Sequence, residues 1–284
     1  MRDLWWDEAF LHLNFRWESI VTESSVVLPF QILPGLVQVG FIGPYSLAFT
    51  PENPINRETI NNVWSELLGK FEEFEMQVRL PPEIYYRDLF RANFRVLNDL
   101  GARVLYQDVN FHLDLKGDFR DSINRNRNRE LKRGLSRNYV FEQIDLRDAY
   151  KVILANRLAK GLQPSLSEQQ FVQLHELFTE RLKFHGIKQE GKLVSASITL
   201  IVNPTLAYVF MWGHDPSEPT SGESISTLCE NLFLTFKSEG YEYLCLGTAS
   251  TLGVVDVGLS MYKSSLGAIE SYRITMGKTR GIST

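Results

Sequence analysis

Apolar residues recur along the chain with two periods, and together they predict a mixed α/β protein. "SVVLPFQIL" and "LVQVGFI" are β-rich runs separated by the turn signal "PG", and "KLVSASITLIV" and "LAYVFMWGHD" repeat this arrangement around "NPT". Each pair predicts two antiparallel strands. Apolar residues at helical spacing predict helices at 56–74, 85–101, 122–138, 146–161, 167–186 and 221–240. Shorter runs predict strands at 75–80, 102–115, 241–247 and 268–277.

Charge narrows the classes of partner. The 284 residues carry a formal net charge of −4, so the protein lacks the basic footprint expected of a duplex-DNA-binding protein. One stretch differs, because residues 116–137 hold eight basic and three acidic side chains. This stretch predicts a basic helix that either faces solvent or binds phosphate groups. An RNA-binding module is a third interpretation, but only Phe119 interleaves with the run.

The remaining composition indicates a protein of a reducing compartment. Cys229 and Cys245 lie in apolar surroundings, which predicts buried free thiols, and no Cys or His pair has metal-ligand spacing. The N-terminus carries early acids and lacks the apolar core of a secretory signal. Prolines and glycines break the uncharged runs at 24–51 and 193–213, so we expect strand pairs, no transmembrane segment and a cytoplasmic location.

The segment "GLSMYKSSLGA" (258–268) places a single cation, Lys263, beside the aromatic Tyr262 among apolar residues. Two interpretations stay open from the residues alone. The lysine either extends to the surface from a loop, or stands in an apolar cleft. In a cleft its charge would stabilise an oxyanion strongly, because water is excluded there.

Three stretches resemble the Fem-type aminoacyltransferases, which build peptidoglycan cross-bridges and belong to the GNAT-like acyltransferases. They are "FHLDLKGDFRDSINRNRNRELKRGL", then "YVFMWGHD" with the helix leading to "EGYEYLCLG", and finally "GLSMYKSSLGA". "LGTASTLGVVDVGLSMYKSSLGA" is also similar to related proteins encoded among surface-polysaccharide genes.

The resemblance implies two tandem GNAT-like domains with mostly antiparallel sheets flanked by helices. Residues 1–115 would form the first domain and residues 116–267 the second, and the strand at 268–284 would return to the first. Lys263 would then face a cleft between the halves and stabilise the tetrahedral intermediate or the leaving group. Tyr262 would shape the pocket.

A general base is harder to assign from the sequence. His214 ends the apolar run "MWGHD" and titrates near neutral pH, while Asp215 and Asp256 are alternatives. A turn histidine without a catalytic role is the competing interpretation for His214. Trp212, in the same run, is a candidate to contact the substrate.

Two features are candidates for phosphate binding. Arg125, Arg129 and Arg133 recur every four residues and so share one helix face, where guanidinium groups would suit a diphosphate. The loop "PSEPTSGESIS" leads into a helix at the position of the coenzyme A loop in GNAT enzymes. Gly222 and Ser224 could contribute there, but Glu223 would repel phosphate, and the serines could simply cap the helix.

The sequence thus predicts an acyl or aminoacyl transferase acting on an amine of a cell-envelope precursor. The acceptor would be a peptidoglycan peptide, an amino-sugar intermediate or a lipid-linked precursor, and the donor either acyl-CoA or aminoacyl-tRNA. No cofactor is assigned from the sequence beyond these two candidate donors. The alternatives are a non-catalytic GNAT-fold binding protein and a CoA-dependent N-acetyltransferase for a nucleotide sugar.

Overall fold

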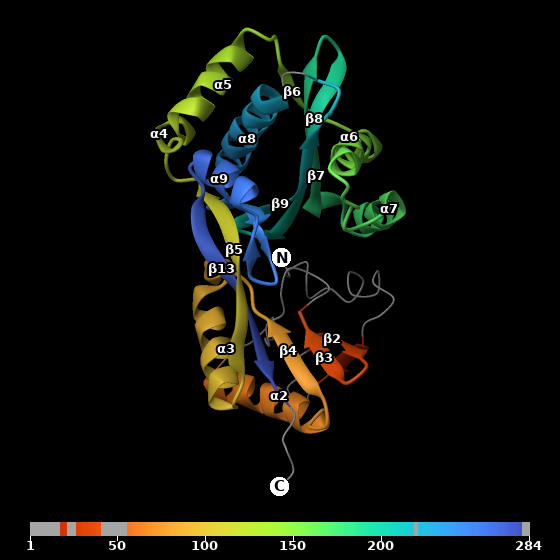
Figure 1. The fold of residues 1–284 in the computed structure, drawn as a ribbon, viewed down its shortest axis with the longest axis vertical. Coiled ribbons are helices and arrows are strands. Elements are labelled where there is room, and N and C mark those ends of the chain that lie inside the picture. Colours follow the sequence, from red (N-terminus) through yellow and green to blue (C-terminus); the bar gives the residue numbers. More distant parts are fainter. Residues whose placement is uncertain (1–17, 22–26, 41–55, 219–220, 280–284) are drawn as a thin grey trace. The chain divides into compact units, whose positions relative to one another are not determined.

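The computed structural model describes residues 18–21, 27–40, 56–218 and 221–279 (Figure 1). The chain folds as two compact units. Unit 1 comprises Phe111–Gly247 and Val257–Glu270. Unit 2 comprises the described residues before Phe111 together with Thr248–Asp256 and the described residues from Ser271 onward. The chain therefore passes between the units several times, and each unit is built from segments far apart in sequence.

Unit 2 is a mixed sheet with two helices. Its strands are ordered β1 (Glu18–Val21), β2 (Val27–Leu33), β3 (Leu36–Val39), β4 (Glu75–Arg79), β13 (Ile269–Lys278) and β5 (Arg103–Asp114). The β3–β4 pair is parallel, whereas β13 runs antiparallel to β4 with Thr275 opposite Arg79. The helices are α2 (Arg57–Lys70) and α3 (Arg87–Asp99), preceded by the 3-10 turn η2 (Glu83–Tyr85). They meet where Trp64 Nε1 donates to Asn93 Oδ1 at 2.7 Å in the core.

A two-stranded ribbon, β11 (Ser250–Thr251) with β12 (Val254–Val255), belongs to unit 2 and is fastened to β5 by one carboxylate. Asp108 is 1% exposed and accepts hydrogen bonds from the Ser250 hydroxyl at 3.0 Å and the Gly253 N–H at 3.1 Å. Arg273 Nη2 lies 2.9 Å from its second oxygen. These contacts lower the pKa of Asp108, so the ribbon is held by a charged carboxylate across the neutral pH range.

Unit 1 contains the rest of the same 11-stranded order of the described residues, in which β5 is the shared strand. Its strands follow the order β5, β10 (Tyr243–Thr248), β9 (Leu206–His214), β8 (Lys192–Asn203), β7 (Leu182–Gln189) and β6 (Val140–Gln143). Only the β9–β10 pair is parallel among the registers from β6 to β10. Its helices are α4 (Phe119–Ser122), α5 (Arg125–Leu135), α6 (Leu146–Ala159), α7 (Glu168–Leu177), α8 (Ser221–Ser238) and α9 (Val257–Ser265).

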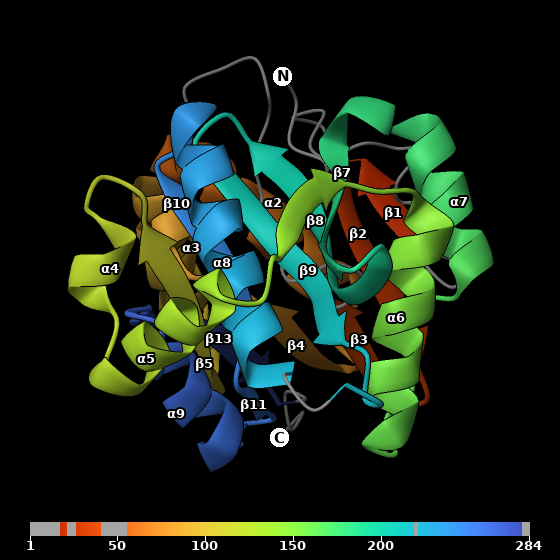
Figure 2. The ribbon, with the colours of Figure 1, turned by 90° about the horizontal axis from the view of Figure 1, so that it is seen from above.

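The sheet of unit 1 has two differently covered faces (Figures 1 and 2). We call the face covered by α5, α8 and α9 the front face, and the face covered by α6 and α7 the reverse face. Successive residues of β7 point to opposite faces, as the strand period requires. His185 packs its ring on Phe236 of α8, while Phe184 packs on His175 of α7.

The two strand pairs predicted around "PG" and "NPT" are confirmed. β2 and β3 pair antiparallel, as do β8 and β9, although residues 24–26 and 41–51 of the first uncharged run lie outside the described residues. The predicted mixed α/β class is confirmed as well.

The helix predicted over 167–186 is wrong in its second half. α7 ends at Leu177, a 3-10 turn η3 (Thr179–Arg181) follows, and residues from Leu182 onward form strand β7. The apolar residues Leu182 and Phe184 fit either period, and eight residues of pairing with β8 favour the strand. Lys263 lies on helix α9, so the interpretation that places it on a loop is excluded.

Some features are absent from the described residues. In that part of the chain no helix is long and apolar enough to cross a membrane. No group of three or more His, Cys, Asp or Glu side chains is arranged there to hold a metal ion. Both cysteines are buried free thiols, and burial raises the pKa of Cys229. Neither thiol is therefore suited to nucleophilic chemistry.

Candidate active site

Helix α9 turns Lys263 into the interior of unit 1. Val257 and Met261 on the same helix are exposed, whereas Lys263 is 3% exposed. Its ammonium donates a hydrogen bond to the carbonyl oxygen of Gly247 at 3.0 Å and lies 6.0 Å from the ring centroid of Phe111. The surface-exposed alternative for this lysine is therefore excluded. Burying an ammonium costs free energy unless polar groups accept hydrogen bonds from it. A buried lysine at this position therefore suggests a functional role.

Two glycines with a left-handed backbone adjoin Lys263 and the end of α9. Gly247 has φ +76°, and a Cβ there would stand 3.2 Å from the ring of Tyr208. Gly267 ends α9 with φ +75°, and a Cβ there would stand 2.4 Å from the Ser122 hydroxyl oxygen and 2.7 Å from the Ser122 carbonyl oxygen. Both positions need the left-handed backbone that glycine adopts freely. Gly267 thus allows the end of α9 to approach Ser122 closely, and Gly247 carries the carbonyl that accepts the Lys263 hydrogen bond.

Tyr262 lies beside Lys263 on the front face, within a cage of side chains. The guanidinium carbon of Arg127 stands 4.9 Å from the centroid of the Tyr262 ring, and the ring of Trp212 is 6.1 Å away. Burial raises the pKa of Tyr262, so it remains a neutral phenol at any physiological pH. Its hydroxyl lies near Ser226 but has no hydrogen bond of good geometry in the described part of the chain. It can donate a proton to a hydrogen bond, but it cannot serve as a base.

Arg127, which contacts the Tyr262 ring, belongs to a charged network with Glu130 and Ser226. Arg127 Nη1 lies 2.5 Å from Glu130 Oε2, and the Ser226 hydroxyl donates to the same oxygen at 2.7 Å. The two charged side chains are 18% and 15% exposed. The sequence prediction missed Arg127 and Glu130. The signal that could have found Arg127 is the spacing of Leu131 and Gly134, which follow it by four and seven residues and so share its helix face.

The predicted row of arginines lies on the outward face of α5. Arg125, Arg129 and Arg133 are all exposed. Arg133 Nε forms an ion pair of 2.9 Å with Glu223 Oε1, and Arg137 reaches the other oxygen at 3.0 Å. Glu223 is 8% exposed and stands in the first turn of α8. One guanidinium of the row is therefore already used inside the protein.

The residues predicted at the start of α8 have different surroundings. A Cβ on Gly222 would stand 3.4 Å from Glu130 Oε1, so its backbone adjoins the network under Tyr262. Ser224 is 1% exposed, and its carbonyl oxygen accepts a hydrogen bond from the Ser195 hydroxyl at 3.3 Å. The Ser224 hydroxyl is thus turned into the core.

The candidate bases differ in their protonation. His214 ends β9 two residues after Trp212, so both side chains point to the same face. Burial, with the charge of Lys160, lowers the pKa of His214, which is therefore neutral at pH 7. Hydrogen bonds from Ser217 and Lys192 lower the pKa of Asp215 to about 2. Asp256 is exposed and belongs to unit 2.

A β-bulge stands next to this cluster. Ile198 pairs with Met211 and Thr199 with Val209, which leaves Phe210 as an extra residue in β9. A bulge changes the direction of the side chains that follow it. Here Phe210 contacts Phe171 of α7 on the reverse face, whereas Trp212 reaches Tyr262 on the front face.

Comparison with known proteins gives no match at the level of sequence. No family model matches the chain, and no curated protein matches it significantly.

Solved structures show the similarity instead. FemX aligns with a TM-score of 0.67 at 11% identity over 96% of this chain and 90% of its own. L-PGS from Bacillus licheniformis aligns with 0.67 at 13% identity, over 96% and 87% of the two chains. The C-terminal domain of a putative lysylphosphatidylglycerol synthetase from Agrobacterium fabrum aligns with 0.66 at 11% identity, over 98% and 88%. The predicted resemblance to Fem-type, GNAT-fold acyltransferases is thus confirmed for the fold.

Proposed function

We propose that the protein is an acyltransferase that forms an amide on an amine of a cell-envelope precursor. The acceptor would be a peptidoglycan peptide or an amino sugar. The fold shared with FemX and L-PGS supports the class of reaction. The observation that carries the proposal is the burial of the Lys263 ammonium beside Tyr262. An exposed lysine would instead have favoured a non-catalytic binding protein.

The proposed reaction begins when the neutral amine of the acceptor attacks the carbonyl carbon of the donor. The carbonyl π electrons move to oxygen and create an oxyanion. Lys263 would donate a hydrogen bond to that oxyanion, as it donates one to the Gly247 carbonyl oxygen in the structure. The oxyanion then collapses, and the bond to the leaving alkoxide or thiolate breaks. A preformed cation in a low-dielectric site is worth about 10²–10³ in rate for such a step.

The amine must also lose a proton. We propose His214 as its acceptor, because its lowered pKa keeps the imidazole neutral and its side chain shares a face with Trp212. Asp215 is a poor base, since a carboxyl whose pKa is about 2 holds a proton weakly. Tyr262 and Trp212 would form apolar walls that exclude water.

The residues at the start of α8 bear on the identity of the acyl donor. GNAT enzymes bind the coenzyme A diphosphate on backbone N–H groups at a helix N-terminus. In this chain the Glu223 carboxylate stands in that turn, where it would repel a diphosphate, and it engages Arg133 and Arg137, which are then not available to bind one. We therefore propose an aminoacyl ester such as aminoacyl-tRNA over acyl-CoA. Arg125 and Arg129, which form no ion pair among the described residues, would contact its phosphates.

The test is detection of a product by mass spectrometry. The protein is incubated with UDP-linked muramyl peptide or UDP-linked amino sugars, together with aminoacyl-tRNA or acetyl-CoA. We expect an acceptor whose mass has risen by one aminoacyl group. A product formed only from acetyl-CoA would replace the proposed donor. Acceptors that raise the melting temperature without yielding product from either donor would establish the non-catalytic alternative.

A further inference from the structure

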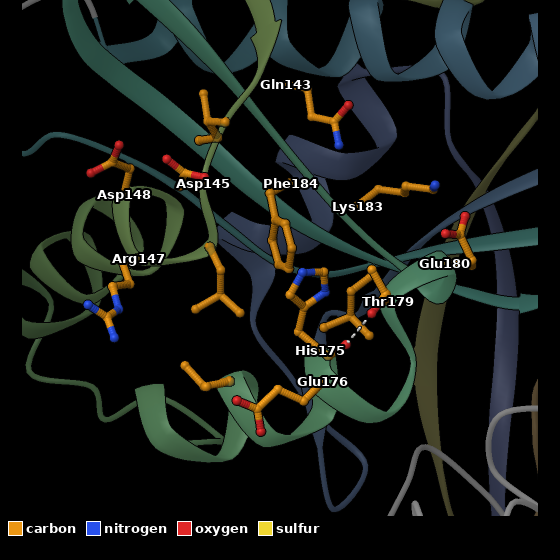
Figure 3. A pocket seen from close by; sticks show the side chains of 14 residues that line it. Gln143, Asp145, Arg147, Asp148, His175, Glu176, Thr179, Glu180, Lys183 and Phe184 are labelled. Carbon is orange, nitrogen blue, oxygen red and sulfur yellow. Dashed lines mark hydrogen bonds between the residues drawn. The ribbon is translucent and has the colours of Figure 1, made fainter.

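A pocket of about 780 Å³ opens on the reverse face of unit 1, away from Lys263 (Figure 3). Its walls come from the β6–α6 connection, α7, η3 and the start of β7. Phe184 of β7 faces into it, while the next residue, His185, contacts α8 on the front face. The sheet therefore separates the pocket from the cluster around Tyr262. The proposed acyl transfer makes no use of it.

The floor of the pocket is apolar and aromatic. The rings of His175 and Phe184 meet edge to face, with centroids 5.1 Å apart, in the middle of the pocket (Figure 3). Ile144, Val172 and Leu182 extend this surface. The Nδ1 atom of His175 is buried and has no hydrogen-bond partner in the described part of the chain. A polar atom in that state costs free energy unless a ligand or water satisfies it.

The rim of the pocket is acidic. Four carboxylates line it, from Asp145, Asp148, Glu176 and Glu180, and none of them forms an ion pair with another described residue. Two basic residues, Arg147 and Lys183, also line the pocket and do not balance the four acids. Lys183 precedes Phe184 on β7 and so points to the front face, where its charge acts on His185. Arg147 extends away from the centre, and its Nε lies 3.7 Å from Glu168 outside the pocket (Figure 3). Asp145 precedes α6, yet its side chain makes no capping hydrogen bond.

We infer that this pocket binds a small organic cation, an ammonium group carried on an aromatic or aliphatic stem. The stem would lie on the half-buried side chains of Ile144, Val172 and His175, with the buried ring of Phe184 behind them. The ammonium would donate charge-assisted hydrogen bonds to Asp145 and Glu176. His175 Nδ1 can accept a further hydrogen bond in the neutral tautomer that protonates Nε2. Phosphate-bearing ligands are disfavoured by the acidic rim, so the pocket is not a subsite for the proposed donor.

The test compares three probes that share one body and differ in charge. Phenethylammonium, 2-phenylethanol and phenylacetate are titrated into the ¹⁵N-labelled full chain, and amide shifts are followed by NMR. We expect saturable binding of the ammonium with a Kd of about 1 mM, with shifts at Thr179 and Phe184. The alcohol should bind about tenfold more weakly, and the carboxylate should not bind. Equal binding of alcohol and ammonium, or no saturation by about 50 mM, would overturn the inference.

Variants locate the site. The double variant Asp145→Asn with Glu176→Gln should weaken ammonium binding about tenfold, and Asn can begin a helix as well as Asp. Glu239→Gln, an exposed acid after α8, is the matched control and should leave binding unchanged. Shifts confined to amides of α8 and α9 would contradict the assignment. Acyl transfer by the double variant should equal that of the unaltered chain, so the two proposals fail separately.

Discussion

The two faces of the unit 1 sheet differ in whether their charged side chains form ion pairs. On the front face, Arg127 pairs with Glu130, and Glu223 pairs with Arg133 and Arg137, around a buried neutral phenol. On the reverse face, four carboxylates surround a cavity without ion pairs among the described residues. Paired charges fix side chains in one geometry, as a reaction centre needs. The carboxylates of the reverse face are exposed and, within the described part of the chain, unpaired instead, which is the setting in which we propose that a cation binds. Measuring the stability of variants on each face tests whether the two faces differ in this way.

The largest expected effect on stability is the destabilisation of the folded chain at low pH by protonation of His185, on the front face. Burial, with the charge of Lys183, lowers the pKa of His185 to about 4. The histidine of the unfolded chain takes up a proton near pH 6.5, whereas that of the folded chain does so only near pH 4. The free energy of unfolding is therefore unaffected by protonation of His185 above pH 6.5 and falls as the pH drops from 6.5 toward 4. The loss amounts to about 3 kcal/mol. In His185→Phe, urea unfolding from pH 7 to 4 should show a smaller decline.

His112 provides the internal control for that experiment. Burial lowers its pKa to about 4 as well, so part of the decline should survive in the variant. Identical pH profiles for the variant and the unaltered chain would show that His185 takes up its proton in the folded state.

The next effect is on the network under Tyr262. Glu130→Gln leaves the guanidinium of Arg127 without its carboxylate in a mostly buried place. We expect a loss of about 2 kcal/mol in the free energy of unfolding, less than for a fully buried pair. Denaturant unfolding measures it, with Glu239→Gln as a surface control. A loss below about 0.5 kcal/mol would mean that the front network does not hold its geometry.

A smaller effect is expected where α5 meets α8. Glu223→Gln weakens two ion pairs whose arginine side chains are 62% and 42% exposed. Solvent screens such pairs, so the expected loss is about 1 kcal/mol, and added salt should reduce the difference from the unaltered chain. Thermal unfolding at low and high salt checks this. A salt-independent loss would point to packing instead of charge.

The smallest effect should come from the reverse face. Glu176→Gln removes a carboxylate that forms no ion pair among the described residues, so stability should change by less than about 0.5 kcal/mol. A stabilisation within that range would fit relief of repulsion from the neighbouring acids. A loss as large as that of Glu130→Gln would show that both faces rely on their charges equally, and the comparison would fail.

Much of the fold follows from local patterns. The strand pairs at β2–β3 and β8–β9 were predictable because a turn signal separates two apolar runs. α7 was extended too far because Leu182 and Phe184 suit both periods, and only pairing with β8 decides between them. α9 was missed because only eight residues lie between Gly258 and Gly267, which is too short a window for a helical period. The predicted domain boundaries stay a prediction.

The candidate site was predictable only in part. Lys263 and Tyr262 were found from their segment and its resemblance, but their roles stay predictions. Counting every fourth residue selected Arg125, Arg129 and Arg133, whereas Leu131 and Gly134 turn Arg127 inward. Which arginine meets an aromatic ring depends on where α9 packs, and no local pattern contains that information. The pocket on the reverse face joins three separate segments, so it too needs the tertiary structure.

The central claim is that the buried ammonium of Lys263 stabilises the oxyanion. The direct test is the single-turnover rate of amide formation in Lys263→Met, with Lys132→Met, an exposed lysine of α5, as the matched control. Methionine keeps much of the volume and removes a buried charge, so the fold should remain as stable. We predict a rate lower by about 10²–10³ in Lys263→Met and an unchanged rate in Lys132→Met. A folded Lys263→Met protein that transfers at the full rate would contradict the account.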